Sequence, residues 1–242
     1  MASIADTSQQ AAGELGPLGG FKFMAIPDNT YFGPNQNKIG QNYGDVRRQN
    51  TEEQLVSLEL RLRDLLIKQI DELGRDDNDE TKVFSPFPLA ISTCVAIDAL
   101  GEVFFKYDKK RTEKNQQYTF TSVLNKFDKS FSRPLPKQFK SGLSNLISDY
   151  KSENINSRSD LIYKTFRNSL MHGYKARAVY ITQENIEWSE NENDGYLIIN
   201  PYWFWERFKL VFDKLFNDLK EAHEENNPYK ISAHYYVKKL LE

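Results

Sequence analysis

The stretch that decides the fold class is PLAISTCVAIDALGEVFFKY, residues 88–107. It is apolar on nearly every side of a helix, and Pro86 and Pro88 mark where that helix begins. A helix that is apolar all round belongs at the centre of a protein. Its polar exceptions, Asp98 and Glu102, are four residues apart and therefore lie on one face. The sequence thus predicts a mainly α protein built around this helix.

Segments with helical periodicity lie on both sides of the central helix in the sequence. The first begins at Asn50 or Thr51, where Glu53 or Gln54 is placed for a capping box, and it ends at Gly74. Its apolar stripe consists of Leu55, Leu58, Leu62, Leu65, Leu66 and Ile70. The polar run RDDNDETK that follows is expected to be a loop. Further helices are expected over about 118–130, 137–151 and 158–173.

The last third of the chain combines strands with an aromatic helix. Residues 178–182 (AVYIT) and 195–199 (GYLII) are typical of strands, with 186–188 as a third candidate and ENENDG as a turn. A long helix then runs from Asn200 to about residue 225. It carries one stripe of aromatic residues, which favours core packing over ligand stacking: Phe204, Phe208, Phe212 and Phe216. The sequence therefore predicts a helical bundle with a small β-hairpin inserted before the last long helix.

Two regions of different character divide the chain. Residues 1–48 are rich in Gly, Asn, Gln and Pro and follow no helical or strand period, so we expect an irregular N-terminal extension. Residues 49–242 form the expected helical domain, with its core at about 52–225.

Composition restricts the function classes. The 242 residues carry a net charge of −2, which argues against a surface that is basic overall. A local basic surface is still compatible with this charge. The single cysteine, Cys94, excludes an intrachain disulfide and is expected to be a small buried hydrophobe in a reducing compartment. The N-terminus lacks the pattern of a signal peptide, and no apolar stretch is expected to cross a bilayer. These features predict a cytoplasmic protein without a membrane partner.

The motif that carries chemistry is FRNSLMHGY, residues 166–174. Arg167 is followed by Asn168 and, after four intervening residues, by His172. This arrangement resembles the Arg–x(4–6)–His motif of HEPN domains, which are helical bundles found in toxin–antitoxin, antiviral defence and CRISPR-associated ribonucleases. The resemblance implies a ribonuclease that acts on RNA without a cofactor. Three histidines and one cysteine also give no credible zinc cluster.

The residue types of the motif suit RNA cleavage without a metal. Histidine titrates near neutral pH, so His172 is the candidate acid and base for the 2′-OH and the leaving 5′-oxygen. A forked guanidinium stabilises negative charge on non-bridging phosphate oxygens, which is the expected role of Arg167. The resemblance implies that Asn168 positions the phosphate or the arginine. The expected products are a 2′,3′-cyclic phosphate and a 5′-OH.

The spacing of the motif raises a geometric question. On a straight helix, Arg167 and His172 point about 140° apart. They share a site only if Arg167 reaches round, if the helix distorts near Gly173, or if a second subunit contributes. HEPN ribonucleases place two motifs at a composite cleft, so the resemblance implies a homodimer.

Other residues are candidates for supporting roles. Asp98 or Glu102 is expected either to orient Arg167 or His172, or to face a lysine. Tyr174 completes an Arg–x4–His–x–Tyr pattern that resembles HEPN toxins silenced by nucleotidyltransferase antitoxins, which implies an antitoxin or other regulatory partner. The alternative is a non-catalytic HEPN scaffold for dimerisation or nucleotide binding. There the arginine and histidine belong to a structural network.

Basic residues gather in two places. Lys164, Lys175 and Arg177 surround the motif and are candidates for RNA binding. From residue 106 to residue 140 there are ten Lys or Arg against three acids, interleaved with aromatics. This stretch either follows an RNA backbone or is a solvated surface whose aromatics face the core.

Overall fold

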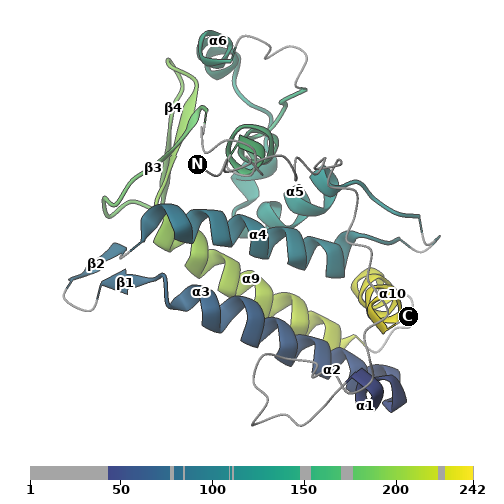
Figure 1. Cartoon of the computed structure of the whole chain (residues 1–242). Coiled ribbons are helices and arrows are strands. Elements are labelled where there is room, and N and C mark those ends of the chain that lie inside the picture. Colours follow the sequence, from purple (N-terminus) through teal and green to yellow (C-terminus); the bar gives the residue numbers. More distant parts are fainter. Residues whose placement is uncertain are drawn as a thin grey trace, which may run out of the picture.

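A computed structural model of the chain describes residues 43–76, 79–83, 85–108, 110, 112–147, 154–169, 177–222 and 227–241 (Figure 1). For residues 43–45, 75–76 and 79–83 it describes the backbone alone. The described part is mainly helical, with one three-stranded and one two-stranded sheet. The predicted mainly α class is therefore confirmed.

The first long helix runs without a break from α2 (Thr51–Leu62) through the π-helical η1 (Arg63–Lys68) to α3 (Gln69–Asp71). The side chain of Asn50 accepts a hydrogen bond from the Glu53 backbone N at 3.0 Å, and the Glu53 carboxylate accepts one from the Asn50 backbone N at 3.1 Å. This confirms the predicted start and capping box.

The polar run after this helix differs from the prediction. It was expected to be a loop, but its backbone forms the short antiparallel strands β1 (Arg75–Asp76) and β2 (Asp79–Val83). Side-chain polarity does not prevent such pairing, because the backbone groups of a chain reversal need hydrogen-bond partners whatever their side chains are.

The central helix is α4 (Pro86–Phe105), as the sequence predicts. It packs against α5 (Gln116–Phe127), α9 (Pro201–Glu221) and α10 (Pro228–Leu241), and Figure 1 shows it crossing the middle of the molecule. Its most deeply buried large side chains are Leu89, Ile97, Leu100, Val103 and Phe104.

The aromatic stripe of α9 completes this core. Phe204, Phe208, Phe212 and Phe216 are at most 1% exposed, and the ring of Phe216 meets that of Phe104 on α4 at 5.0 Å, edge to face. The predicted packing role of the stripe is confirmed. The helix ends at Glu221, close to the predicted end near residue 225.

A second group of helices lies beyond α5. These are η2 (Lys129–Ser132), α6 (Lys137–Leu146), α7 (Arg158–Leu161) and η3 (Ile162–Arg167). The predicted helix 137–151 ends early, because Ile147 adopts an extended conformation and is buried. The predicted helix 158–173 is present up to Ser169, and residues 170–176 lie outside the described residues.

The three-stranded sheet precedes α9 and consists of β3 (Val179–Ile181), β4 (Trp188–Asn191) and β5 (Tyr196–Ile199), in the order β3-β5-β4. Both expected strands are present, but the predicted hairpin pairing between them is wrong. β3 pairs parallel to β5, and β4 forms the antiparallel hairpin with β5. After β3 the chain crosses to the opposite edge of the sheet, where it forms β4. The turn at Gly195 (φ 70°) therefore connects β4 to the central strand β5.

The N-terminal boundary also differs from the prediction. Residues 43–48, expected to be irregular, form α1 (Tyr43–Arg48), and residues 1–42 lie outside the described residues. The Arg47 Nε donates to the carbonyl oxygen of Leu241 at 2.7 Å, which ties α1 to the end of α10. This hydrogen bond joins the two ends of the described part of the chain.

The apolar character of α4 corrects one expectation. By length and composition it is the one helix in the described part of the chain that passes as a membrane-span candidate, although no such stretch was expected. More than half of the apolar window is buried inside the molecule, as in a core helix.

Candidate functional site

The helix α7–η3 places Arg167. It begins with a capping box, in which Ser157 accepts from the Asp160 backbone N at 3.2 Å and the Asp160 carboxylate accepts from the Ser157 backbone N at 3.1 Å. Ile162 and Phe166, four residues apart, lie in the core. Because Arg167 follows Phe166 directly, its side chain leaves the helix at the edge of the buried face.

The end of η3 is a π-helical turn, in which the Asn168 backbone N bonds to the Tyr163 carbonyl oxygen. Short π-helical turns occur often at functional sites. The turn sets the position of the first two motif residues, Arg167 and Asn168.

The guanidinium of Arg167 is held on two sides. Its Nε donates to Asp98 Oδ2 at 2.8 Å, and its Nη2 lies 2.7 Å from the same oxygen. Its Nη1 donates to Asn168 Oδ1 at 3.0 Å. The side chains of Arg167 and Asp98 are 12% and 17% exposed. The structure therefore brings together the predicted residues Arg167, Asn168 and Asp98.

The Asp98 carboxylate is incompletely paired. Both contacts from Arg167 reach Oδ2, whereas Oδ1 is buried and accepts no hydrogen bond from any described residue. Burial raises the pKa of Asp98, and the charge and hydrogen bonds of Arg167 oppose that rise; a weaker contact with Gln116 acts in the same direction as Arg167. Arg167 thus favours the ionised form of Asp98, against the effect of burial.

Tyr163 is a site residue that sequence analysis missed. The guanidinium carbon of Arg167 lies 5.6 Å from the centre of its ring. Burial raises the pKa of Tyr163, so the ring stays neutral under the arginine. The signal was present in the sequence, because Tyr163 precedes Arg167 by four residues and the two share a helix face.

The other acid of α4 has a different partner. Glu102 accepts from Lys106 Nζ at 3.0 Å, and the same lysine lies 3.2 Å from Glu113. Of the two roles that the sequence left open, Glu102 therefore takes the lysine-facing one, and Asp98 contacts Arg167.

Cys94 lies one turn before Asp98 on α4 and is 2% exposed. Burial raises the pKa of its thiol, so the side chain stays neutral. The prediction of a small buried hydrophobe is confirmed.

The remaining predicted residues divide into two groups. Lys164 is half-buried on η3, and the Arg177 backbone N donates to the Thr165 carbonyl oxygen at 3.1 Å, which places residue 177 beside η3. His172, Tyr174 and Lys175 lie outside the described residues. Residue 177 therefore lies beside the helix that carries Lys164 and Arg167.

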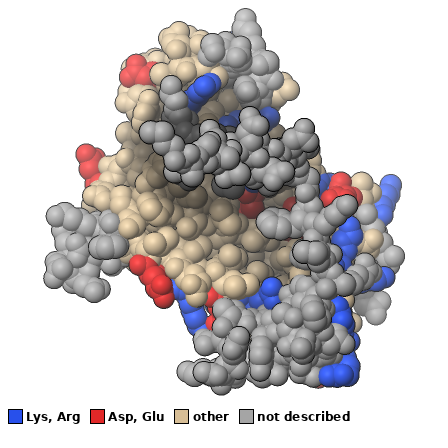
Figure 2. Space-filling model, in the orientation of Figure 1, with Lys and Arg blue, Asp and Glu red and all other residues tan. Residues whose placement is uncertain are grey.

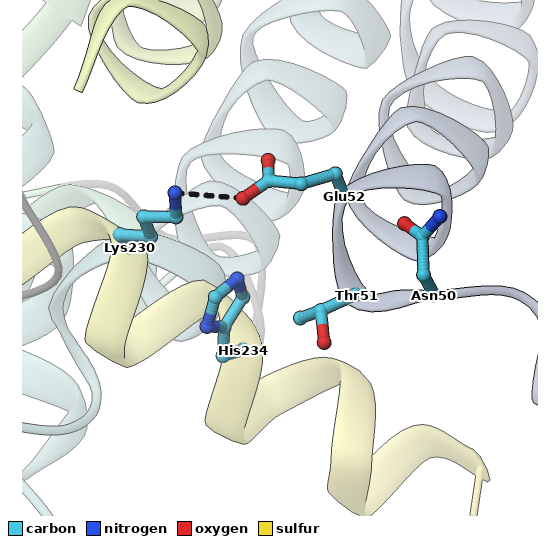
Figure 3. A pocket seen from close by; sticks show the side chains of 5 residues that line it. All are labelled: Asn50, Thr51, Glu52, Lys230 and His234. Atoms are coloured by element: carbon cyan, nitrogen blue, oxygen red, sulfur yellow. Dashed lines mark ion pairs between the residues drawn. The ribbon is translucent and has the colours of Figure 1, made fainter. Parts of the chain in front are cut away.

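A pocket of about 630 Å³ lies at the start of α2, against α10 (Figure 3). It is lined by Asn50, Thr51, Glu52, Lys230 and His234, and Glu52 pairs with Lys230 at 2.7 Å. The Nε2 of His234 is buried, with no hydrogen bond to a described residue. Burial lowers the pKa of His234, so its imidazole stays neutral near pH 7. Sequence analysis gave this histidine no role.

Metal ligands do not gather in the described part of the chain, where no group of three His, Cys, Asp or Glu side chains is placed to hold an ion. No protein-family model, curated protein or solved structure matches the chain. The assignment of a function therefore rests on the residues and their geometry.

Proposed function

We propose that this protein is a metal-independent RNA endonuclease of the HEPN type, in which Arg167 stabilises the scissile phosphate and His172 transfers protons. The observation that carries the proposal is the Arg167–Asp98–Asn168 cluster, which begins the Arg–x4–His motif with a guanidinium fixed in direction. Preorganised positive charge is usually the largest electrostatic contribution to such catalysis.

The geometry of the arginine leaves donors for a substrate. A guanidinium has five N–H groups, and the contacts with Asp98 and Asn168 engage at most three of them. At least two N–H groups remain, one on each terminal nitrogen. A pair of this kind matches two non-bridging oxygens of a phosphate.

The proposed reaction is an internal displacement at phosphorus. His172 takes the proton of the 2′-OH, the 2′-oxygen forms a bond to phosphorus, and the bond from phosphorus to the 5′-oxygen breaks. A second protonated His172 gives its proton to the departing 5′-oxygen. Arg167 holds the charge that gathers on the non-bridging oxygens. The products are a 2′,3′-cyclic phosphate and a 5′-OH.

This reaction favours a homodimer, because it uses two histidines. A surface suited to a second copy lies beside the site: α4 exposes Val95 (43%), three residues before Asp98. Figure 2 shows few charged side chains over the middle of the molecule, where Figure 1 shows α4. A substitution Val95→Asp is expected to separate the dimer and abolish cleavage. Leu210→Asp on α9, at a residue 59% exposed, is the control.

The setting of the proposed enzyme follows from the HEPN resemblance. It includes a cytoplasmic location, a role in prokaryotic defence or a toxin–antitoxin system, and an antitoxin or other regulatory protein that controls activity, for which Tyr174 is the candidate contact.

A non-catalytic scaffold is the second candidate, favoured by one observation. Arg167 is 12% exposed and already paired with Asp98, as in a structural ion pair. In that case the scaffold serves dimerisation or nucleotide binding and does not cleave RNA.

Cleavage of an RNA pool separates the two candidates. Wild type, Arg167→Ala and His172→Ala are incubated with mixed RNA in EDTA, and the ends of the products are identified. His223→Ala, outside the motif, is the matched control. Cleavage by wild type and His223→Ala alone, with 2′,3′-cyclic phosphate ends, supports the enzyme. Equal cleavage by His172→Ala, or none by any protein, contradicts it.

A further inference from the structure

The basic stretch from residue 106 to residue 140 divides into two halves with different partners. In the first half Lys110 is exposed without an ion pair to a described residue, whereas Lys106 pairs with Glu102 and Glu113, and Lys114 pairs with Asp108 at 2.9 Å. At the end of α5, Lys126 lies over the ring of Tyr229 at 5.6 Å. Lys106, Lys114 and Lys126 therefore serve the fold.

The second half is different. Lys129, Arg133, Lys137 and Lys140 make no ion pair with any residue that the structure describes, and all but Lys140 are exposed. The chain from residue 129 to residue 147 contains no Asp or Glu. We call these four residues the cationic ridge. A concentration of uncompensated positive charge of this kind attracts polyanions.

The backbone under the ridge is firmly anchored. Phe131 and Phe139 are 0% exposed, and Phe131 meets Trp188 with ring centres 5.1 Å apart. A Cβ on Gly142 would lie 2.4 Å from the Asn193 carbonyl oxygen, so α6 sits directly on the β4–β5 turn. The ridge is therefore preorganised, and its aromatics face the core instead of a nucleic-acid base.

Nearby acids are engaged or turned away. Asp128 accepts from the Ser130 backbone N at 2.8 Å, and Glu190 is paired with Arg158 at 2.6 Å. The turn that carries Glu192 and Asp194 lies under Gln138 and Gly142. With 100° per residue, Lys137 and Lys140 point about 100° and 160° away from Gln138. The positive charge of the ridge is thus directed to solvent.

The ridge adjoins the start of the helix α7–η3, and Arg167 lies near the end of that helix. Pro134 pairs with Ser157, and the Leu135 backbone N donates to the Asn156 carbonyl oxygen at 2.9 Å, so the ridge adjoins the start of α7. Nine residues separate Arg158 from Arg167, about 14 Å along a helix. A nucleic-acid strand bound to the ridge would reach Arg167 past the half-buried side chains of Asp160 and Lys164, where the Asp160 carboxylate is already hydrogen-bonded to Gln117 and the Ser157 backbone.

We propose that the cationic ridge binds the phosphate backbone of single-stranded RNA and guides it to Arg167. This inference rests on the proposed function for the identity of the nucleic acid. A membrane surface is disfavoured, because α6 buries Phe139 and Leu143 in the core and exposes a single large apolar side chain, Leu146, for insertion.

Binding is tested separately from cleavage with a fluorescent 2′-O-methylated oligonucleotide, which lacks the 2′-OH that cleavage requires. Affinity is measured by anisotropy over a range of salt concentrations for wild type and for a variant with Lys129, Arg133, Lys137 and Lys140 all changed to Gln. Each phosphate contact contributes about 0.7 to the salt slope for single strands. The variant is expected to bind more weakly, with a slope reduced by up to about 3.

A matched variant controls for net charge. It changes Lys114, Lys209, Lys214 and Lys220 to Gln, which removes the same four charges elsewhere. Its affinity and slope are expected to equal those of wild type. Equal loss in both variants, absence of binding by wild type, or ridge-dependent binding to phosphatidylserine vesicles but not to the oligonucleotide would overturn the inference. Ridge-dependent binding without cleavage of natural RNA would support the ridge and contradict the proposed enzyme.

Discussion

Arg158 and Arg167 stand at opposite ends of one helix and are both paired with a largely buried carboxylate. Arg158 meets both oxygens of Glu190, through Nε and Nη2 at 2.6 Å each, and lies 5.9 Å from the ring of Trp188. Arg167 meets a single oxygen of Asp98 and lies over Tyr163 in a similar way.

The difference between the two pairs lies in what remains unsatisfied. In the Arg158–Glu190 pair, two guanidinium nitrogens meet both carboxylate oxygens, and the pair joins α7 to β4. Nη1 of Arg158 also donates to the Ser130 carbonyl oxygen at 3.4 Å. The Arg167–Asp98 pair leaves Oδ1 of Asp98 buried without a partner among the described residues. Buried polar atoms are normally paired, and Oδ1 of Asp98 is one of five unpaired side-chain atoms among the described residues and the one that belongs to a carboxylate. The first pair is suited to stability and the second to binding a ligand.

The largest expected effect on stability is at the Arg158–Glu190 pair, in which both carboxylate oxygens are bonded. Arg158→Ala leaves Glu190 without its partner in a largely buried position, and removal of one member of a buried ion pair costs about 3–5 kcal/mol. The free energy of unfolding from urea denaturation measures this. Lys114→Ala, whose partner Asp108 is exposed, is the control and is expected to change it much less. A loss at Arg158 no larger than at Lys114 would remove the distinction between the pairs.

Arg167→Gln is expected to act mainly on activity. Loss of a preorganised charge on the transition state lowers the rate about 100- to 1000-fold. Its effect on the free energy of unfolding is expected to be smaller than that of Arg158→Ala, because the Asp98 that it leaves can take up a proton. Cleavage assays and urea denaturation on the same samples check both parts. A folded variant with wild-type cleavage would show that Arg167 is structural.

The pH dependence of stability tests the effect of burial on the Asp98 carboxylate. The folded-state pKa of Asp98 is raised, so its contribution to stability is fully present below the unfolded pKa, about 3.9, and declines as the pH rises through the folded pKa. Asp98→Asn removes this decline, and Arg167→Gln, which raises the pKa of Asp98 further, extends it to higher pH. Unfolding free energies between pH 3.5 and 6.5 measure the change. Glu102→Gln is the control, and an identical change there would contradict the assignment to Asp98.

The smallest effect on stability is expected from substitution of His234. This substitution tests whether a buried atom without a hydrogen-bond partner by itself marks a functional site. The pKa of His234 is lowered by burial, so its contribution to stability is present above the unfolded pKa, about 6.5, and is lost as the pH falls through the folded pKa. His234→Gln is expected to flatten the stability profile below pH 6.5 and to leave RNA cleavage unchanged. Loss of cleavage in a folded His234→Gln protein would extend the functional site to the pocket beside α2.

Sequence predicts the site only in part. The four-residue spacing of Tyr163 and Arg167 is local and readable, and so is the placement of Asn168 after the arginine. The choice between Asp98 and Glu102 is not, because both lie on one face of α4 and only the packing of η3 decides which carboxylate reaches the guanidinium. The division of the basic stretch is partly readable, because Glu102 stands four residues before Lys106, and Lys114 pairs with Asp108 within the stretch itself.

By itself the sequence determined the mainly α class, the central place of α4, the capping box at Asn50 and the packing stripe of α9. These depend on hydrogen bonds and side-chain periods within a few residues, which neighbouring residues specify directly. Only the tertiary structure decided the parallel pairing of β3 with β5, the contact of Arg167 with a residue 69 positions away, and the exposure of the cationic ridge. Such features depend on how buried surfaces of distant segments fit together, and no local pattern encodes that fit.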